Sequence, residues 1–530
     1  MKQNWQWVLV IAVFLGWLLD FLFWRQAPGA NFTLYALLCL AGGLAAMRLD
    51  GRKMASGAAW LVPPVVVFAA QTALRAEPLT VLLGVLLTLV LLTLVAASFV
   101  GGRRWRYSAI DYALTPVRLG WSMLTRPLAF LGEARQSRLE ASGMSRRRDL
   151  WPVLRGILLA VPILLLFGAL LSSADLVFGS EVTRALQALQ LQRLPEYVFR
   201  LAYMTAAAWA LLGVFLHAAT QSGDEKTAAD GQLRIPQLLG ATEACIVLGS
   251  VAVLFAAFVL VQFQYFFGGQ VNINIEGYTY AEYARRGFGE LVAVACFSLL
   301  MIMGLGALTR RRSPAERSVF SVLSVVIVIL VGVMLVSAYQ RLNLYEAAYG
   351  FSRLRTYVHV VLVWLGLLLS AVALLELLRR ERLFATTILI ASLGFGLSLS
   401  LINVDSFIVR QNLRRAAQGA PLDVSYLVSL STDADPSLAS MLRSADLPPA
   451  TREAVGAVLV CRLHLNARNH VTDWRSWTLS RSRSEGALHS VRSLLAGYRY
   501  SDADQAVQVM APSGAAYSCL GTPDRADQSP

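Results

Sequence analysis

A polar and aromatic cluster at 277–288 contains the residues of this sequence best suited to bind a ligand. Five of them lie close together between two long apolar runs: Tyr280, Glu282, Tyr283, Arg285 and Arg286. Thr279 and Glu282 have the spacing of a capping box, which covers unpaired N–H groups at the start of a helix. Glu282, Arg286 and Glu290 follow at i, i+4 and i+8, so opposite charges share one helix face. The pattern predicts a charged helix entrance at the end of an apolar span.

A second cluster of the same kind lies at 343–355 and adds Glu346 and Tyr349 to the candidate binding residues. Asn343 and Glu346 again have capping-box spacing, which predicts a second helix start. The two clusters could form one tyrosine-rich polar vestibule. They could equally be helix caps within the aromatic belt that membrane proteins carry at the water interface.

Other motifs that carry chemistry are missing from the sequence. It contains no glycine-rich phosphate loop, no His-Glu-x-x-His and no Gly-x-Ser-x-Gly. Cys461, His464 and His470 lack a fourth ligand at a spacing suited to zinc. Helix caps and turns account for the carboxylates at 405, 423, 433 and 435 more simply than acid–base work does. We therefore predict no catalytic residue, no metal and no cofactor, and we do not expect an enzyme.

The composition is that of a membrane protein. Hydrophobic residues make up 56% of the chain, charged residues 15%, and the mean hydropathy is +0.55. Eleven apolar runs approach the roughly 20 residues that a bilayer core requires. They lie near 6–24, 30–47, 58–74, 78–100, 152–173, 197–218, 239–266, 287–308, 318–339, 357–378 and 383–402. The sequence predicts an all-α polytopic integral membrane protein of about eleven transmembrane helices, with a small, mainly helical soluble C-terminal tail.

The connections between these runs predict the orientation and four regions. Alternate connections carry most of the arginine and lysine, so the N-terminus is predicted inside and, after eleven spans, the C-terminus outside a bacterial cytoplasmic (inner) membrane. Residues 1–100 hold four spans and 151–402 hold seven. Residues 101–150 form a basic inner segment, and 403–530 form the extracytoplasmic tail.

The basic segment at 101–150 interleaves ten arginines with interfacial aromatic residues such as Trp105 and Trp121. This pattern favours a segment that lies on the anionic inner leaflet of the bilayer. A packed cytoplasmic hairpin with a solvated arginine face is the alternative. We expect no nucleic-acid partner for the net charge of +14, because no known nucleic-acid module surrounds these residues.

Five ionisable residues lie within the apolar runs, where such groups are candidates for function: Asp20, His217, Glu243, His359 and Glu376. Most are near the predicted ends of their spans, from which a side chain can reach water. A transport site usually lies near the middle of the membrane. This placement favours a structural role for these groups over a transport pathway.

The tail has its own pattern. Helical periodicity recurs at 404–417, 437–445, 451–468 and 484–497, and the small and polar residues that follow Tyr498 predict a disordered end. The Trp-Arg-Ser-Trp stretch at 474–477 is interpreted as the anchor of a small core. Cys461 and Cys519 could pair if the tail lies in an oxidising exterior.

Several ordered motifs carry a resemblance to a known family. They are Tyr278 to Phe288, with the signature Tyr-x-Glu-Tyr-Ala-Arg-x-Gly-Phe, then Leu344 to Gly350, Asn403-Val-Asp405, and Asp423 to Ala434. Between about 150 and 500 the chain resembles bacterial polytopic membrane proteins that are catalogued as a domain of unknown function. Asp435 departs from the pattern, which has an apolar residue there. The resemblance implies an integral membrane fold and a bacterial origin, and it implies no activity.

Two functions follow from these observations. The first is a non-enzymatic membrane scaffold or sensor whose outer tail meets a protein partner or an envelope ligand. The second is a transporter or membrane-embedded transferase with its site in the two outer clusters. The long soluble tail and the missing mid-membrane charge favour the first.

Overall fold

The computed structural model describes residues 5–101, 115–130, 171, 194–220, 222, 238–267, 288–444, 447–468, 473–503 and 506–519. The candidate residues Tyr280, Glu282, Tyr283, Arg285 and Arg286 lie outside these ranges. So do most of the basic segment and, apart from residue 171, the predicted span at 152–173.

Ten helices of the described part are long and apolar enough to cross a membrane. They coincide with ten of the eleven predicted runs and confirm the all-α polytopic fold. Nine are single helices: α1 (Trp5–Phe23), α2 (Ala30–Leu49), α5 (Pro78–Ala97), α9 (Leu194–Thr220), α10 (Ala241–Phe267), α12 (Phe288–Leu308), α13 (Pro314–Tyr349), α14 (Arg353–Leu377) and α15 (Phe384–Ile402). The tenth combines α3 (Ser56–Ala59) with α4 (Val62–Leu74), whose prolines fall in the first turn, where proline is tolerated.

One compact unit contains α1, the second half of α2, and α9. Helices α1 and α9 approach closely at Gly16, where a Cβ would lie 2.7 Å from the carbonyl oxygen of Met204. Asp20 is buried in this unit and accepts bonds from Arg200 Nε at 2.9 Å and from the hydroxyl of Tyr203. The intramembrane carboxylate of α1 is therefore paired, in line with a structural role.

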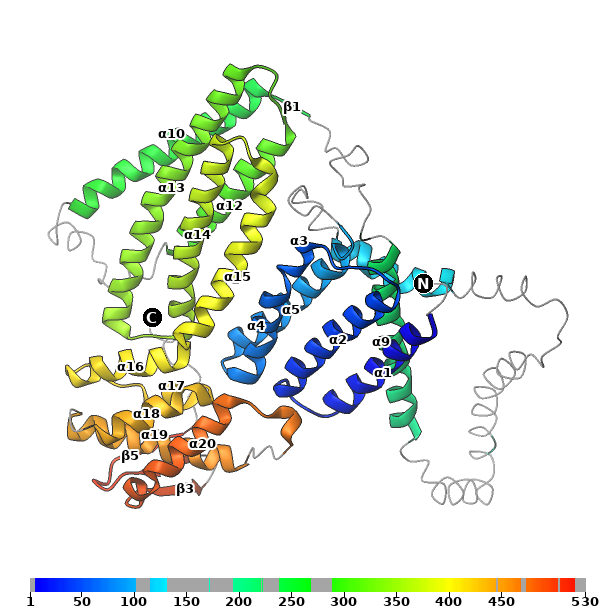
Figure 1. Ribbon diagram of the computed structural model, residues 1–530. Helices are drawn as coiled ribbons and strands as arrows, with labels where there is room; N and C mark the ends of the chain where they lie inside the picture. The colour runs from blue at the N-terminus through cyan, green and yellow to red at the C-terminus, as the bar shows by residue number, and fades with distance from the viewer. Residues whose placement is uncertain are drawn as a thin grey trace. The chain divides into compact units, whose positions relative to one another are not determined.

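The second unit contains α4, α5, α10, α12 to α15 and the C-terminal part of the chain. Helix α13 packs against α10, α12 and α14, and α14 packs against α15 (Figure 1). Ile327, Val331 and Leu342 of α13 are fully buried. With its 36 residues, α13 is about 54 Å long, which exceeds a bilayer core of about 30 Å. Its last turns reach the C-terminal domain.

The C-terminal domain, residues 404–519, is mainly helical (Figure 1). Its helices are α16 (Val404–Ala417), α17 (Val424–Ser429), α18 (Asp435–Arg443), α19 (Pro449–Arg468) and α20 (Leu479–Val491), with 3-10 turns η6 (Thr432–Ala434), η7 (Trp474–Ser476) and η8 (Arg492–Leu495). Helix α19 lies within the core, where Val455, Val458 and Leu459 are fully buried. All four helical patterns expected in the tail correspond to helices.

A small antiparallel sheet follows these helices, in a part of the chain for which we predicted no strands. It has the order β3 (Arg499–Ala503), β4 (Ala506–Met510), β5 (Ala516–Ser518). Val507 and Val509 of β4 are buried while Gln508 and Met510 are exposed. This alternation is typical of a half-buried strand. The strands are too short, and too rich in small and polar residues, for the pattern to predict them from the sequence.

The Trp474–Trp477 stretch does not anchor a core, contrary to our prediction. Trp474 is 55% exposed and Trp477 is 46% exposed, while Ser476 between them is buried. The stretch docks on the connection between α1 and α2. There the Ser476 hydroxyl donates to the carbonyl oxygen of Ala27 at 3.0 Å, and the N–H of Ala30 donates to the carbonyl oxygen of Trp477 at 2.9 Å.

The predicted helix start at Asn343 is also wrong. Helix α13 runs without a break through Asn343 and Glu346 and ends at Tyr349. Gly350 follows with φ of +83°, a left-handed conformation that glycine adopts at lowest cost. The capping-box spacing of Asn343 and Glu346 therefore does not mark a helix start, because the residues before Asn343 already belong to α13.

Candidate functional site: a buried polar junction

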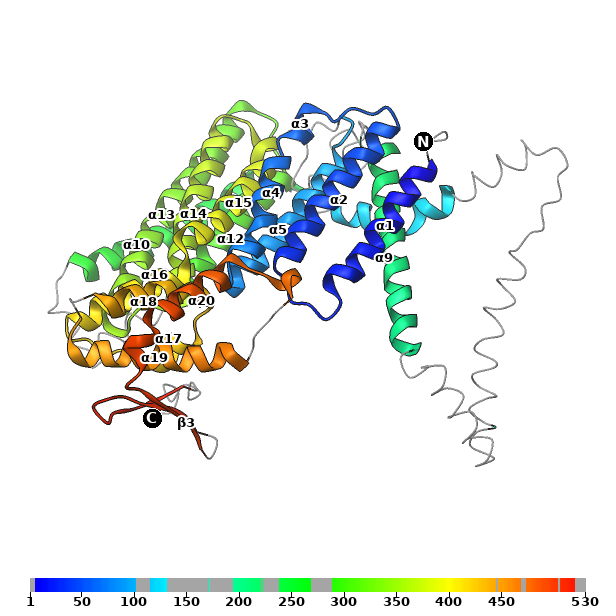
Figure 2. The same cartoon turned by 60° about the horizontal axis from the view of Figure 1, so that its bottom comes forward.

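The C-terminal domain meets the ends of the membrane helices through a group of buried or half-buried polar side chains. We call this group the junction. It comprises Arg75, Glu77, Arg353, Tyr357, Asp405, Tyr426 and Asp433. The charged residues belong to the α4–α5 connection, the start of α14, the first turn of α16, and η6. Helices α4, α5, α14 and α16 are labelled in Figures 1 and 2. The junction lies within the second unit.

The pair Arg353–Asp405 forms one half of the junction. Asp405 is fully buried in the first turn of α16, and Arg353 opens α14. Arg353 Nε donates to Asp405 Oδ1 at 2.8 Å and Nη2 to Oδ2 at 2.6 Å, a bidentate arrangement. The N–H of Ser431 donates to Oδ2 at 2.6 Å, and the N–H of Arg353 donates to the Tyr426 hydroxyl at 2.8 Å. The carboxylate thus joins α14, α16 and the turn before η6.

Asp433 and Glu77 form the other half. Asp433 Oδ2 accepts the N–H groups of Ala76 at 2.8 Å and Glu77 at 3.1 Å, so a carboxylate of the domain covers donors at the start of α5. Glu77 is the N-cap of α5 and accepts the N–H of Thr80 at 2.7 Å and the hydroxyl of Tyr357. The expectation that these aspartates serve as caps holds for Asp433, although the helix that it caps lies 356 residues away in the sequence.

Burial dominates the electrostatics of Asp433. It raises the pKa of this carboxyl above its ordinary value of 3.8, although the N–H of Ala76 and the nearby charge of Arg75 act in the opposite direction. Arg75 Nη1 lies 3.8 Å from Asp433 Oδ1, and Arg75 also donates to the carbonyl oxygen of Ser400 at 2.6 Å. The ionised form of Asp433 is therefore held in place at some cost in desolvation.

This raised pKa predicts a pH dependence of stability. The folded state binds the Asp433 proton more tightly than the unfolded state, so stability falls as pH rises from about 4 through the raised value. Asp433→Asn does not titrate but can still accept the two N–H groups, so its stability relative to wild type should increase over that window. Asp433→Ala leaves both donors unpaired and should cost about 1–3 kcal/mol at any pH. Tm measured from pH 4 to 7 tests this; parallel wild-type and Asn curves would contradict it.

Two of the predicted site residues are described, and they do not meet. Glu346 is buried in the contact between α13 and α14, with Oε1 3.2 Å from His359 Nδ1. His359 Nε2 lies 3.0 Å from Asn343 Oδ1. Tyr349 is 58% exposed, and its ring lies 5.0 Å from that of Tyr345. The second cluster thus divides into a buried carboxylate beside a histidine and an aromatic pair of which Tyr349 is exposed.

The turn between α13 and α14 is clasped by α16. Asn412 makes two bonds with Phe351: it accepts the N–H at 2.8 Å and donates to the carbonyl oxygen at 2.9 Å. Arg415 Nη2 donates to the carbonyl oxygen of Ala347 at 2.8 Å. A Cβ on Gly350 would lie 2.6 Å from Arg415 Nη1, so a larger residue would have to displace the end of that side chain as well as adopt the positive φ.

A second buried ion pair lies inside the C-terminal domain. Asp435 is fully buried and Arg462 is 4% exposed, and Arg462 Nε donates to Asp435 Oδ1. Arg462 also donates to the carbonyl oxygens of Leu430 at 2.7 Å and Ser431 at 2.6 Å, while the Ser484 hydroxyl donates to Asp435 Oδ2. At Asp435, where the resemblance led us to expect an apolar residue, the structure therefore has a buried and fully bonded charge pair.

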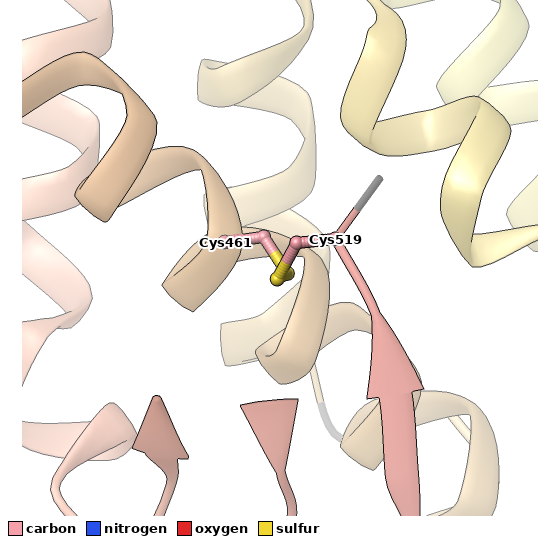
Figure 3. The surroundings of a disulfide bond; sticks show 2 residues. All are labelled: Cys461 and Cys519. Atoms are coloured by element: carbon pink, nitrogen blue, oxygen red, sulfur yellow. A yellow bond between two sulfur atoms is a disulfide. The ribbon is translucent and has the colours of Figure 1, made fainter. Parts of the chain in front are cut away.

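Cys461 and Cys519 form a disulfide, an outcome that the sequence left open (Figure 3). Their Cα atoms are 5.4 Å apart, and 58 residues separate them in the chain. Cys461 belongs to the central helix α19, and Cys519 follows the last strand, β5. The bond ties the sheet to the helical core of the domain.

Arg353, Glu77 and Tyr357 were missed by sequence reasoning as parts of a site. Each lies at the predicted end of a span, where a charged or aromatic residue is common and carries no specific signal. The available signal was the set of carboxylates at 405, 433 and 435 in a segment that follows the last span. In the structure each of them is buried and bonded to an arginine or to backbone donors.

Comparison with known proteins identifies a family for the chain but no activity. No curated protein and no solved structure matches the chain. A family model described as "Domain of unknown function (DUF4153)" matches residues 62–441. This range runs from α4 to α18 and contains every residue of the junction. Because the match covers well over half of the chain, the protein belongs to this DUF4153 family.

Proposed function

We propose that the protein is a non-enzymatic scaffold or sensor of the bacterial cytoplasmic membrane, with its N-terminus inside and its C-terminal domain outside. The domain would meet a protein partner or an envelope ligand, and the junction would transmit that event to α5 and α14. No cofactor is needed for such a role. The function rests on mechanical connection between the domain and the helices.

The observation that carries this proposal is the burial of Asp405 and Asp433 at the junction. A tail that only tethered a binding module would need no buried charge where it leaves the membrane. Here two carboxylates of the domain take bonds from Arg353 and from the backbone of the α4–α5 connection. Buried, fully bonded charges fix one geometry, because any displacement leaves them unpaired. A rigid connection suits a sensor or an assembly platform.

The disulfide supports the outer placement of the domain. Structural disulfides persist in oxidising compartments such as the bacterial periplasm and are rare in the cytosol. The opposite ends of α12 to α15 carry the arginine-rich connections at 310–312 and 379–382, which the positive-inside rule assigns to the cytoplasmic side. Both observations favour the same orientation.

The test breaks the junction while the domain itself is kept intact. Arg353→Gln loses the bidentate pair and leaves Asp405 buried without its counter-charge, so the docking of the domain should weaken by about 2–3 kcal/mol. We expect this variant to accumulate in the membrane yet fail to complement a deletion phenotype. Arg414→Gln is the matched control, because Arg414 is exposed on α16 and its replacement also removes one arginine charge but leaves the bonds of the junction intact.

Limited proteolysis of purified protein separates the outcomes. In the Arg353→Gln variant, cleavage between α15 and α16 should accelerate while the domain remains resistant. Full complementation by this uncoupled variant would contradict the proposal. Loss of complementation by Glu346→Gln alone, with normal docking of the domain, would instead favour a transporter or transferase that uses the outer clusters.

A further inference from the structure

A cavity rich in arginine lies at the end of α13 and α14 remote from the C-terminal domain. It measures about 1070 Å³ and is lined by the end of α12, the connection to α13, the first turns of α13, and the turn between α14 and α15. Seven arginines line it: residues 310–312, Arg317, and the three of the turn at 379–382. The lining side chains that the structure describes include one carboxylate, Glu376.

The carboxylate of Glu376 already has a cationic partner, Arg311. Arg311 Nη1 donates to Glu376 Oε1, and Arg311 Nη2 donates to the carbonyl oxygen of Gly306 at 3.0 Å. The Arg311 guanidinium lies 4.5 Å above the ring of Phe320, and Ser321 adds a bond to Glu376 at 3.3 Å. The pair is therefore fixed and locally neutral. Six further arginines line the cavity, and Glu376 is the one acidic side chain among the described lining residues.

The remaining arginines are exposed and line the same cavity. Within the described part of the chain, no ion pair involves Arg310, Arg379, Arg380 or Arg382. Like charges at such proximity repel one another, and a bound anion would remove that repulsion. Guanidinium groups suit phosphate in particular, because their fixed fork of donors matches phosphate oxygens.

Two local features suggest that the cavity is retained for binding. Arg379 has φ of +56° at the position after α14 where the Schellman motif favours glycine. Its N–H donates to the carbonyl oxygen of Glu376, and that of Arg380 donates to Leu375. Thr309 also lines the cavity; it is 2% exposed, and its Oγ1 has no hydrogen-bond partner among the described residues. A buried hydroxyl without a partner points to a ligand or a water there.

The apolar part of the lining favours a lipid as the source of the phosphate. Val322 and Leu377 line the same cavity and are 57% and 51% exposed. They lie one turn along apolar helices from the arginines, where an acyl chain could pack beside a headgroup. Basic pockets between membrane helices bind the headgroups of anionic lipids in this manner. The volume exceeds that needed for a single phosphate.

We propose that this cavity binds an anion carrying at least two phosphate charges, supplied by the headgroup of an anionic lipid. Neither the junction nor the C-terminal domain takes part. The binding would neutralise the cluster at 310–312 and 379–382, and the buried Thr309 hydroxyl would donate to a phosphate oxygen.

The test compares Tm and lipid binding of the purified full-length chain in neutral detergent. Cardiolipin, a lipid with two phosphates, should raise Tm saturably, and phosphatidylcholine should not. Arg379→Gln with Arg382→Gln should weaken cardiolipin binding by about tenfold or more. The control pair, Arg414→Gln with Arg443→Gln, removes two exposed charges from the C-terminal domain and should bind as wild type. Thr309→Val keeps every charge and should weaken binding by about fivefold.

The difference in stability between wild type and the Arg379/Arg382 variant should change sign when cardiolipin is added, which makes the result specific. Without an anion, the Arg379/Arg382 variant should be at least as stable as wild type, since it loses repelling charges; with cardiolipin, wild type should be the more stable. Inorganic pyrophosphate forms a separate arm. If it alone stabilises wild type through these arginines, the phosphate site stands and its source is soluble. Equal effects of both lipids, equal weakening by the control pair, or no shift with any of these anions would overturn the proposal.

Discussion

Arg462→Met is expected to lower the free energy of unfolding of the C-terminal domain by roughly 3–5 kcal/mol, the cost of removing one partner from a buried ion pair. Asp435 would remain fully buried, and among the described residues the Ser484 hydroxyl alone would still bond to its side chain. The carbonyl oxygens of Leu430 and Ser431 would lose their donor as well. Urea unfolding of the purified protein, monitored by the susceptibility of residues 404–519 to proteolysis, measures this change in the free energy of unfolding.

A double variant distinguishes a lost pair from a lost side chain. Asp435→Leu with Arg462→Met replaces both charges with apolar groups of comparable size, which is often neutral or stabilising. The double variant should therefore recover much of the stability lost by either single one. Arg443→Met, on the exposed face of α18, is the control and should change stability by less than about 0.5 kcal/mol. If Arg462→Met changes the free energy of unfolding no more than this control does, the Asp435–Arg462 pair does not stabilise the domain.

The helices could be predicted because their signal is local. An apolar run of about 20 residues identifies a span whatever surrounds it, and ten such runs correspond to helices. Even the Pro63–Pro64 run became α4, since both prolines fall in its first turn. The same local reasoning failed at Asn343, where the spacing of two residues suggested a start and the helix simply continues.

The junction could not be predicted because its partners are distant in the sequence. Arg353 and Asp405 are 52 residues apart, and Asp433 bonds to the backbone 357 residues before it. Each residue taken alone resembles an ordinary helix terminus or turn. Which termini meet depends on how the helices pack, and the local pattern around each residue does not reveal that packing. The vestibule built on Glu282 stays a hypothesis, because residues 277–287 lie outside the described part of the chain.

The disulfide provides the second large effect, and it links stability to topology. Because 58 residues separate Cys461 and Cys519, the loop-entropy relation gives about 4 kcal/mol of stabilisation. Cys461→Ser with Cys519→Ser should therefore destabilise the domain by roughly that amount. Reduction of wild-type protein should have the same effect, and it should have no further effect on the double variant.

The bond also tests on which side of the membrane the domain lies. In a background where Cys39, Cys245 and Cys296 are replaced by serine, the two remaining thiols should be blocked to alkylation in growing cells. They should become reactive when the oxidant of the cell envelope is removed, because an exterior domain depends on that oxidant, whereas a cytosolic domain stays reduced in either strain. A reporter fused after Pro530 should be active only in its exported form. Freely alkylated thiols in normal cells, together with a cytosolic reporter signal, would place the domain inside and reverse the orientation proposed for the helices.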